Sequence, residues 1–280
     1  MKALDITVII LTYNEEVHIR RCLENVKQIA RDIVVVDSQS TDATIKICEE
    51  CGARVVQHEW PGYQAAQFNW AINHIPVRTE WIMRIDADEY LLPELIKELK
   101  EKVPTLRPEV TGIEFKRRHL FMGKWMKHGI YPVFLLRMFR VGCAQCDDRK
   151  MDEHLVLNSG KSVIFENDFC DHSLISVTDY CKKHLLYAQR EATAIVDGNK
   201  EHVRYVPSIG LNDQARKKRK VKNVYNRLPL FWRSFAYFLY RYFLRGGFLD
   251  GKEGFLFAFI QGWWYRSLVD ANILEMRKRN

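Results

Sequence analysis

The sequence predicts an α/β fold with a Rossmann-like, mostly parallel central sheet and a C-terminal helical extension that is basic and aromatic. Continuous apolar runs at 6–11, 33–36 and 81–85 have the pattern of strands buried on both faces. Segments with apolar residues at helical spacing lie between these runs. Strands and helices that alternate in this way are typical of a doubly wound sheet.

The first hundred residues supply most of the predicted elements. We expect strands at 6–11, 33–36, 54–57 and 81–85, and helices at 19–29, 43–51, 65–75 and from Pro93 onward. Right-handed crossovers place the turn after every parallel strand at the same edge of the sheet. The polar clusters at 12–16, 37–42 and 86–89 should therefore meet in one crevice, where such folds usually bind nucleotides.

The pattern changes after Pro104. We expect strands at 111–118, 133–139 and 163–165 and a helix at 178–194, followed by a polar and mobile stretch at 196–222. Beyond it, Arg233, Tyr237, Arg241 and Arg245 would share one helical face. The charge-free run 254–265 is shorter than the roughly 20 residues of a spanning helix, so an interfacial surface or an ordinary packing helix is expected.

Composition limits the partners. The 280-residue chain has a net charge of +8, which favours a phosphate ligand, a nucleic acid or an acidic membrane surface. Seven cysteines suit a reducing compartment, and the N-terminus does not resemble a secretory signal. Cys143, Cys146, Cys170 and His172 are possible zinc ligands, although such spacing often arises by chance.

Three carboxylates, Asp86, Asp88 and Glu89, follow the run at 81–85 within four positions. Like charges this close repel, and burying them unpaired is costly. A divalent cation that carries a phosphate is one solution, and an acidic cap for the helix at Pro93 is the other. The sequence contains neither a G-x-G-x-x-G nor a P-loop motif, so a dinucleotide fingerprint and a P-loop are excluded.

Three motifs together resemble family 2 glycosyltransferases with the GT-A fold. They are Ile9–Glu15 (IILTYNE), Val35–Asp42 (VVDSQSTD) and Asp86–Glu89 (DADE), each at the end of an expected strand. A narrower resemblance, to lipopolysaccharide-core β-glucosyltransferases, rests on segments 129–132, 136–140, 152–155 and 245–251.

The resemblance implies a nucleotide-sugar donor, an Mg²⁺ or Mn²⁺ ion and inversion at the anomeric carbon. It assigns donor binding to Thr12, Tyr13, Asn14, Glu15, Asp37, Ser38, Asn69, Asp86, Ala87 and Arg137. Asp88 would hold the metal together with Asp86, and His172 would be a third ligand or else a structural residue. The metal would act as a Lewis acid for the leaving nucleoside diphosphate.

Two positions depart from many relatives. Ser38 replaces a second aspartate, and Phe68 stands before Asn69 where a basic residue is common. The negative charge of the donor phosphates would then be neutralised by Arg84, by Arg137 or by the metal alone.

Inverting transfer needs one base on the acceptor side, because the hydroxyl attacks directly. The resemblance assigns this role to Glu153, with Asp152 as the alternative. From the residue types alone, without the resemblance, Glu153 and His154 would be interpreted as a solvated polar turn.

The expected domains are a glycosyltransferase domain at 1–200, a basic linker at 201–222 and an amphipathic helical segment at 223–280. Within the glycosyltransferase domain, residues 1–104 would form the nucleotide-sugar half and residues 105–200 the acceptor half. The sequence thus predicts a metal-dependent enzyme that moves a hexose from a nucleotide-sugar, most simply a UDP-sugar, to a lipid-linked glycan or lipopolysaccharide-core acceptor.

We expect a cytoplasmic protein attached peripherally to the inner face of the membrane, whose anionic surface attracts the basic tail. Alternatives are sugar transfer to polyprenyl phosphate, nucleotidyl transfer, and a basic nucleic-acid-binding protein that uses 216–222. We expect no nucleic-acid partner if the enzyme assignment holds.

Overall fold

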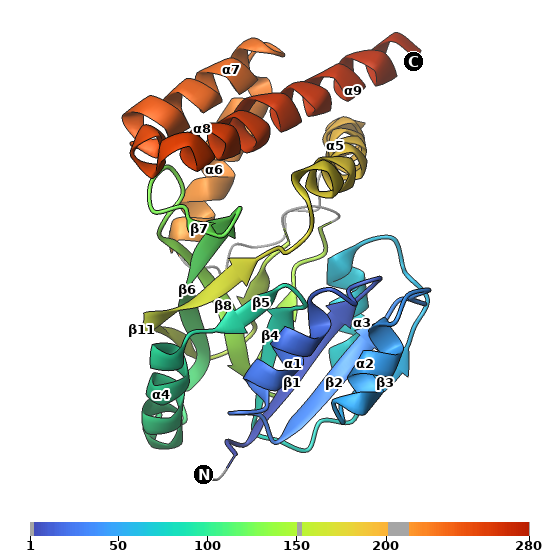
Figure 1. Ribbon diagram of the computed structural model, residues 1–280, viewed down its shortest axis with the longest axis vertical. Coiled ribbons are helices and arrows are strands. Elements are labelled where there is room, and N and C mark those ends of the chain that lie inside the picture. The colour runs from blue at the N-terminus through green and yellow to red at the C-terminus, as the bar shows by residue number, and fades with distance from the viewer. Residues whose placement is uncertain (1–2, 150–152, 201–212, 280) are drawn as a thin grey trace. The chain divides into compact units, whose positions relative to one another are not determined.

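The computed structural model describes residues 3–149, 153–200 and 213–279, which form two compact units (Figure 1). Among these residues, the first unit comprises 3–118, 133–149 and 153–174. The second comprises 119–132, 175–200 and 213–279. Asp152 and the sequence between 201 and 212 lie outside the described residues.

The first unit begins with the predicted parallel strands. They are β1 (Ile6–Thr12), β2 (Asp32–Asp37), β3 (Arg54–Gln57) and β4 (Trp81–Asp86), and they pair in the order β3-β2-β1-β4. The helices between them are α1 (Ile19–Val26), α2 (Thr44–Glu50) and α3 (Gln64–His74). These elements confirm the predicted strand-and-helix alternation.

The apolar runs are continuous because helices cover both faces of this part of the sheet. On β1, Val8 and Ile10 belong to the same core cluster as Leu23 of α1. Ile9, which points the other way, packs in a second cluster with Phe68 of α3. All five side chains are fully buried.

The rest of the sheet is antiparallel, which differs from the mostly parallel sheet that was expected. Next to β4 lie β8 (Val133–Arg140), β6 (Val110–Phe121), β11 (Lys161–His172) and β5 (Glu89–Leu91). Antiparallel neighbours need no crossover helix between them. Helix α4 (Pro93–Lys102) begins at the predicted proline and is followed by the 3₁₀ turn η1 (Val103–Thr105). Strands β9 (Ala144–Cys146) and β10 (Leu155–Leu157) form a separate pair.

The second unit is mainly helical. The short strand β7 (Lys124–Trp125) pairs with the end of β6. The helices are α5 (Val177–Lys200), α6 (Asp213–Arg227), α7 (Trp232–Leu239), α8 (Gly251–Ala258) and α9 (Tyr265–Arg279). The 3₁₀ turn η3 (Gly247–Asp250) and the π-helical turns η2 (Tyr240–Leu244) and η4 (Phe259–Trp264) lie between the last three helices.

Two expectations about the C-terminal part were wrong. Residues 213–222 belong to helix α6 rather than to a linker, and 196–200 continue helix α5. Helix α5, which was expected to belong to the first domain, packs instead against α9, where Ala188 and Ala192 meet Val269 and Ile273.

The expected helical face is not an exposed basic surface, because two of its arginines, Arg233 and Arg241, are buried. Arg233 donates to Asp270 at 2.8 and 2.5 Å, and both side chains are about 1% exposed. Arg241 is also buried and lies over the rings of Tyr237 and Phe257. Within the described residues, the helices are too short or too polar to cross a bilayer.

Candidate functional site

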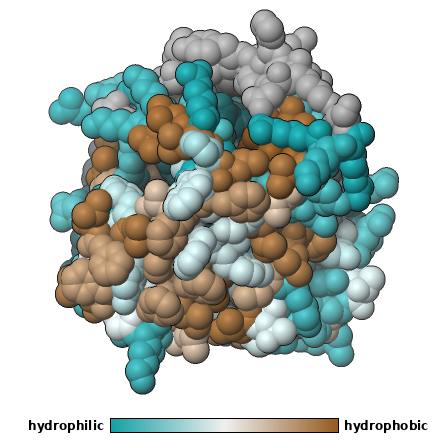
Figure 2. Space-filling view, turned by 90° about the horizontal axis from the view of Figure 1, so that it is seen from above, coloured by the Kyte–Doolittle hydropathy of each residue, from teal (hydrophilic) through white to brown (hydrophobic). Residues whose placement is uncertain are grey.

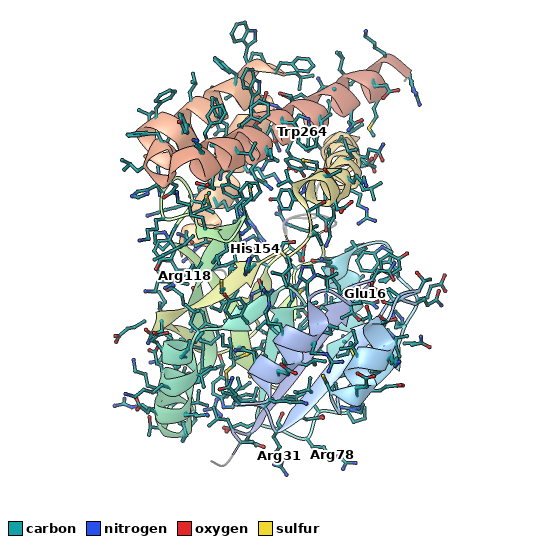
Figure 3. All side chains as sticks on the ribbon, in the orientation of Figure 1. Glu16, Arg31, Arg78, Arg118, His154 and Trp264 are labelled. Carbon is teal, nitrogen blue, oxygen red and sulfur yellow. The ribbon has the colours of Figure 1, made fainter. Side chains whose placement is uncertain are left out.

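The polar turns that follow β1, β2 and β4 meet at one edge of the first unit. In the strand register, Thr12 lies beside Asp37 and Leu11 beside Asp86. Figure 3 shows Glu16 near this edge and Arg31 at the opposite end of the unit. The predicted convergence of the three polar clusters is therefore confirmed.

Asp37 organises the first two turns from a fully buried position. Its Oδ1 accepts hydrogen bonds from the hydroxyls of Thr12 (2.9 Å) and Ser40 (2.5 Å), and its Oδ2 accepts one from the Ser40 N–H (2.8 Å). Asn14 has a positive φ of 54° and links the turns, since its N–H donates to Ser40 and its Oδ1 accepts from the Thr41 N–H. Asp37 and Asn14 thus shape the edge that a donor would meet.

His18 fixes the start of α1. Its Nε2 accepts a hydrogen bond from the Leu174 N–H at 2.9 Å, so the neutral ring carries its proton on Nδ1. That proton is donated to Glu15 Oε2 at 2.7 Å. The Glu15 N–H in turn donates to Thr44 Oγ1 at 2.8 Å, which ties this turn to α2.

The other predicted donor residues differ in how open they are. Tyr13 is 59% exposed, so its ring is open to a ligand at this edge. Ser38 is buried, and its hydroxyl accepts from Gln67. Asn69 exchanges two hydrogen bonds with the backbone of Cys146, at 2.9 and 2.8 Å, and holds β9 against α3. A donor role for Ser38 and Asn69 stays a prediction.

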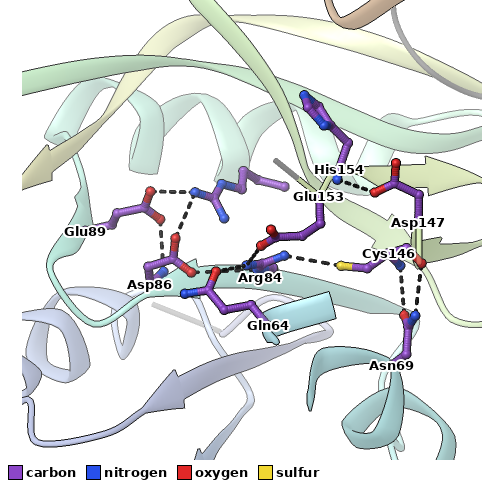
Figure 4. Close-up of polar contacts among 10 residues, drawn as sticks. Gln64, Asn69, Arg84, Asp86, Glu89, Cys146, Asp147, Glu153 and His154 are labelled. Carbon is purple, nitrogen blue, oxygen red and sulfur yellow. Dashed lines mark hydrogen bonds and ion pairs between the residues drawn. The ribbon is translucent and has the colours of Figure 1, made fainter. Parts of the chain in front are cut away.

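Two buried arginines pair with two members of the acidic triplet, Asp86 and Glu89 (Figure 4). Arg137 donates to Glu89 at 2.5 Å and to Asp86 at 3.3 Å, while the Asp86 N–H donates to Glu89 at 2.9 Å. Burial alone would raise the pKa of Asp86, but Arg137 and then Arg84 reverse this effect and hold that pKa below its usual value. Asp86 therefore remains an anion. Glu89, to which the sequence assigned no role, anchors Arg137.

Arg84 extends this network toward the predicted base. Its guanidinium lies 3.0 Å from Glu153 Oε1 and 3.7 Å from Asp86 Oδ1. It also donates to the Cys146 thiol at 3.2 Å and lies over the Phe68 ring. The Glu153 side chain is only 13% exposed, so it does not form the solvated turn that the residue types alone suggested.

Arg21 joins the two segments that carry the predicted metal ligands, and sequence reasoning missed this residue. The His172 N–H donates to the Asp88 carbonyl, and Arg21 donates to the carbonyls of Asp88 (2.9 Å) and His172 (2.6 Å). Arg21 also lies 3.3 Å from Nδ1 of His172, which must accept because a guanidinium only donates. The neutral ring then carries its proton on Nε2. A metal-ligand role for His172 would require this arrangement to change, and it stays a prediction.

The residues present suit an ion that arrives with a phosphate better than a closed metal site. Among the described residues, no three His, Cys, Asp or Glu side chains gather closely enough to hold a metal, which also removes the zinc hypothesis for Cys143, Cys146, Cys170 and His172. Mg²⁺ is commonly bound by one or two carboxylates together with phosphates and water. Asp86 and Asp88 supply such oxygen donors at the sheet edge and fit that mode.

Comparisons with known proteins agree with this geometry. The sequence model of the family described as glycosyl transferase family 2 matches residues 7–161, more than half of the chain. A protein of Rickettsia bellii described as an uncharacterized glycosyltransferase is 29% identical over 276 residues, which cover 91% of this chain and 82% of the relative. The lipopolysaccharide core biosynthesis glycosyltransferase LpsC of Rhizobium meliloti is 30% identical over 164 residues, covering 55% and 57%.

A solved structure shows the same fold. It is the mannosyltransferase PcManGT from Pyrobaculum calidifontis, in complex with GDP-Man and Mn²⁺, and it matches 98% of this chain and 88% of its own with a TM-score of 0.53 and 17% identity. The GT-A fold expected from the sequence is confirmed. With its motifs, its sheet and the match over 7–161, the chain belongs to glycosyl transferase family 2.

Proposed function

We propose that this glycosyltransferase moves a hexose from a UDP-sugar to a hydroxyl of a lipid-linked glycan or lipopolysaccharide-core acceptor, with inversion. The observation that carries the proposal is the pair of carboxylates on Arg84: Asp86, in the donor motif, and Glu153, the predicted base. One displacement needs these two functions side by side. The partial similarity to a lipopolysaccharide core glycosyltransferase supports the acceptor class.

The donor side is built from the turn after β1 and the acidic triplet. Asp86 and Asp88 would hold Mg²⁺ or Mn²⁺ with the donor diphosphate, and the ion supplies Lewis-acid stabilisation of the leaving group. Arg84 and Arg137 keep Asp86 ionised and oriented. The exposed ring of Tyr13 would lie against the nucleotide.

On the acceptor side, Glu153 takes the proton of the attacking hydroxyl. The acceptor oxygen bonds to the anomeric carbon as the bond to the diphosphate oxygen breaks, and the nucleoside diphosphate leaves with the bonding electrons. Its neighbour Asp152 lies outside the described residues and remains the alternative base.

The two units would act on a membrane-bound substrate. The second unit exposes large apolar side chains: Trp232, Phe243, Leu244, Phe248, Leu249 and Phe255. Figure 2 shows hydrophobic side chains gathered in the middle of one face, with hydrophilic ones around them. Such a surface would hold the enzyme peripherally on the anionic inner face of the cytoplasmic membrane.

A thermal-shift panel tests the proposed donor. UDP-, GDP- and TDP-sugars are added with Mn²⁺ or with a chelator, because a ligand that binds only the folded state raises the melting temperature. We expect the largest rise with a UDP-sugar and Mn²⁺, and its loss with the chelator and in Asp88→Asn. A GDP-sugar that shifts the protein most would contradict the UDP assignment. A shift that survives both chelator and Asp88→Asn would contradict the metal site.

A further inference from the structure

A line of alternating acidic and basic side chains runs through the site. Glu89 pairs with Arg137, Arg137 with Asp86, Asp86 with Arg84, and Arg84 with Glu153. Arg84 lies on β4 and Arg137 on β8, and both side chains are at most 10% exposed. Arg84 is therefore the link between the donor motif and the predicted base (Figure 4).

Glu153 depends on this link for its orientation. It lies in irregular backbone just before β10. Within the described residues, Arg84 is the hydrogen-bond and ion-pair partner found for its carboxylate. A glutamate without such a partner would sample several rotamers, since holding a long side chain in one of them costs conformational entropy.

Arg84, by contrast, is held from several sides. Besides Glu153 and Asp86, its guanidinium donates to the Cys146 thiol at 3.2 Å and to Gln64 Oε1 at 3.3 Å, and it lies over the Phe68 ring. A planar, five-donor group fixed in this way is a rigid support for a carboxylate.

The pair formed by β9 and β10 has other supports, so Arg84 is not needed to keep it in place. Asn69 joins Cys146 to α3 through two hydrogen bonds. Asp147 and His154 exchange two more, at 2.9 and 2.6 Å, next to Glu153. The contact with Arg84 therefore acts on the Glu153 side chain rather than on the position of these strands.

We infer that Arg84 is a positioning residue for the reaction: it holds the Glu153 carboxylate at a fixed place beside Asp86, so that the base meets the acceptor hydroxyl next to the donor. The inference rests on the proposed function, since it requires Glu153 to be the base. Arg84 acts through Glu153, and its loss should be felt in the chemical step.

A double-mutant cycle tests this coupling. UDP release from UDP-glucose is measured with Mn²⁺ and a core-truncated lipopolysaccharide for the wild type, Arg84→Gln, Glu153→Gln and the double variant. Each single change should lower kcat by about 10²–10⁴-fold, as expected for loss of a general base. The kcat of the double variant should be no more than about threefold below that of the less active single variant. Arg84→Lys should retain more activity than Arg84→Gln.

Arg137 provides the matched control. It is an equally buried arginine of the same sheet that pairs with Asp86 and Glu89 rather than with Glu153. The effects of Arg137→Gln and Glu153→Gln on kcat should therefore multiply. The affinity for UDP is measured by calorimetry for the same four proteins, and there the effects of Arg84→Gln and Glu153→Gln should show no coupling. A general collapse of the site would instead produce coupling in both kcat and UDP affinity.

Hydrogen exchange tests, without any turnover, whether the effect is confined to the side chain. Arg84→Gln should leave exchange of the amides at 153–157 as in the wild type, because Asn69 and Asp147 hold the strand pair without Arg84. Multiplying effects of Arg84→Gln and Glu153→Gln, or faster exchange at 153–157 in Arg84→Gln, would overturn the inference. A wild type that releases no UDP with any UDP-sugar would instead count against the proposed function.

Discussion

Asp86 is the residue at which the two arginines meet, and its surroundings explain how three carboxylates can stand so close together. The guanidinium of Arg137 pairs with Asp86 and Glu89, and that of Arg84 pairs with Asp86, so repulsion between these two carboxylates is reduced. The divalent cation that the sequence predicts at this point stays a prediction, and the two arginines are positive charge that the protein itself supplies. Glu89 is the most deeply buried member of the triplet.

Glu89→Ala should destabilise the protein strongly, because it leaves the buried Arg137 with one carboxylate fewer. Breaking a buried ion pair by removing one partner typically costs about 3–5 kcal/mol, and urea unfolding measures this free energy. Glu59, an exposed glutamate of the same unit, is the control, and Glu59→Ala should change it by less than about 0.5 kcal/mol. Equal stability of the two variants would mean that Arg137 does not depend on Glu89.

At the scale of elements, the sequence was most informative where partners are local. Strands β1 to β4 are continuous apolar runs, and their helices follow within a few residues. Strand β11 was recognised only at 163–165, because the polar residues Glu166 and Asp168 interrupt it. Asp168 pairs with Lys116 and Arg118, about fifty residues earlier, and periodicity does not reveal such distant partners.

Site residues, too, could be predicted where their signal is local. The motifs at 12–16, 37–42 and 86–89 could be recognised because each follows the end of an apolar strand. Arg21 was missed because two of its partners are backbone carbonyls 67 and 151 residues away, which leave no trace in residue type. The role of Glu89 depended in the same way on Arg137, a distant residue of β8.

Helix α4 is attached to β11 through Glu98, and this contact should depend on pH. Glu98 accepts the N–H groups of Glu166 and Asn167 and pairs with Lys102. Burial would raise the pKa of Glu98, but these hydrogen bonds outweigh burial and lower it below 4.5. A carboxyl whose pKa is lower in the folded state stabilises the fold above the unfolded pKa, and this contribution is lost as the pH falls through the folded pKa.

Glu98→Gln should therefore lower the free energy of unfolding at pH 7 by about 1–3 kcal/mol, the usual worth of hydrogen bonds to a charged group. The difference from the wild type should shrink as the pH falls below about 4.5, which urea unfolding at several pH values can follow. The exposed Glu101 of the same helix is the control. A pH-independent difference in Glu98→Gln would argue against an ionised Glu98.

At the scale of the whole molecule, net charge and exposed apolar side chains both support the membrane surface that we propose as a partner. The chain carries a net charge of +8, and in the second unit Leu244 and Leu249 are 80% and 61% exposed. Lys217, Lys218 and Lys220 of α6 are exposed as well. Exposed leucines with basic residues are the composition of an interfacial membrane surface.

The full chain should float with vesicles that contain phosphatidylglycerol and much less with phosphatidylcholine alone, and 0.5 M salt should weaken the binding. Leu244→Ser with Leu249→Ser should reduce partitioning about tenfold or more, since each buried leucine contributes up to about 1.5–3 kcal/mol. Ile164→Ser removes a comparably exposed side chain from the first unit and should have no effect. Equal flotation of the double variant and the wild type would show that these leucines do not contribute to membrane binding.

Arg21 has a practical consequence for studying this enzyme. Arg21 donates hydrogen bonds to the backbone carbonyl oxygens of Asp88 and His172, and every amino acid has a backbone carbonyl oxygen. Replacing either side chain therefore leaves these two attachments available. Asp88→Asn and His172→Ala should report on metal chemistry with the loop geometry largely preserved, whereas Arg21→Ala would move both segments at once and report on neither.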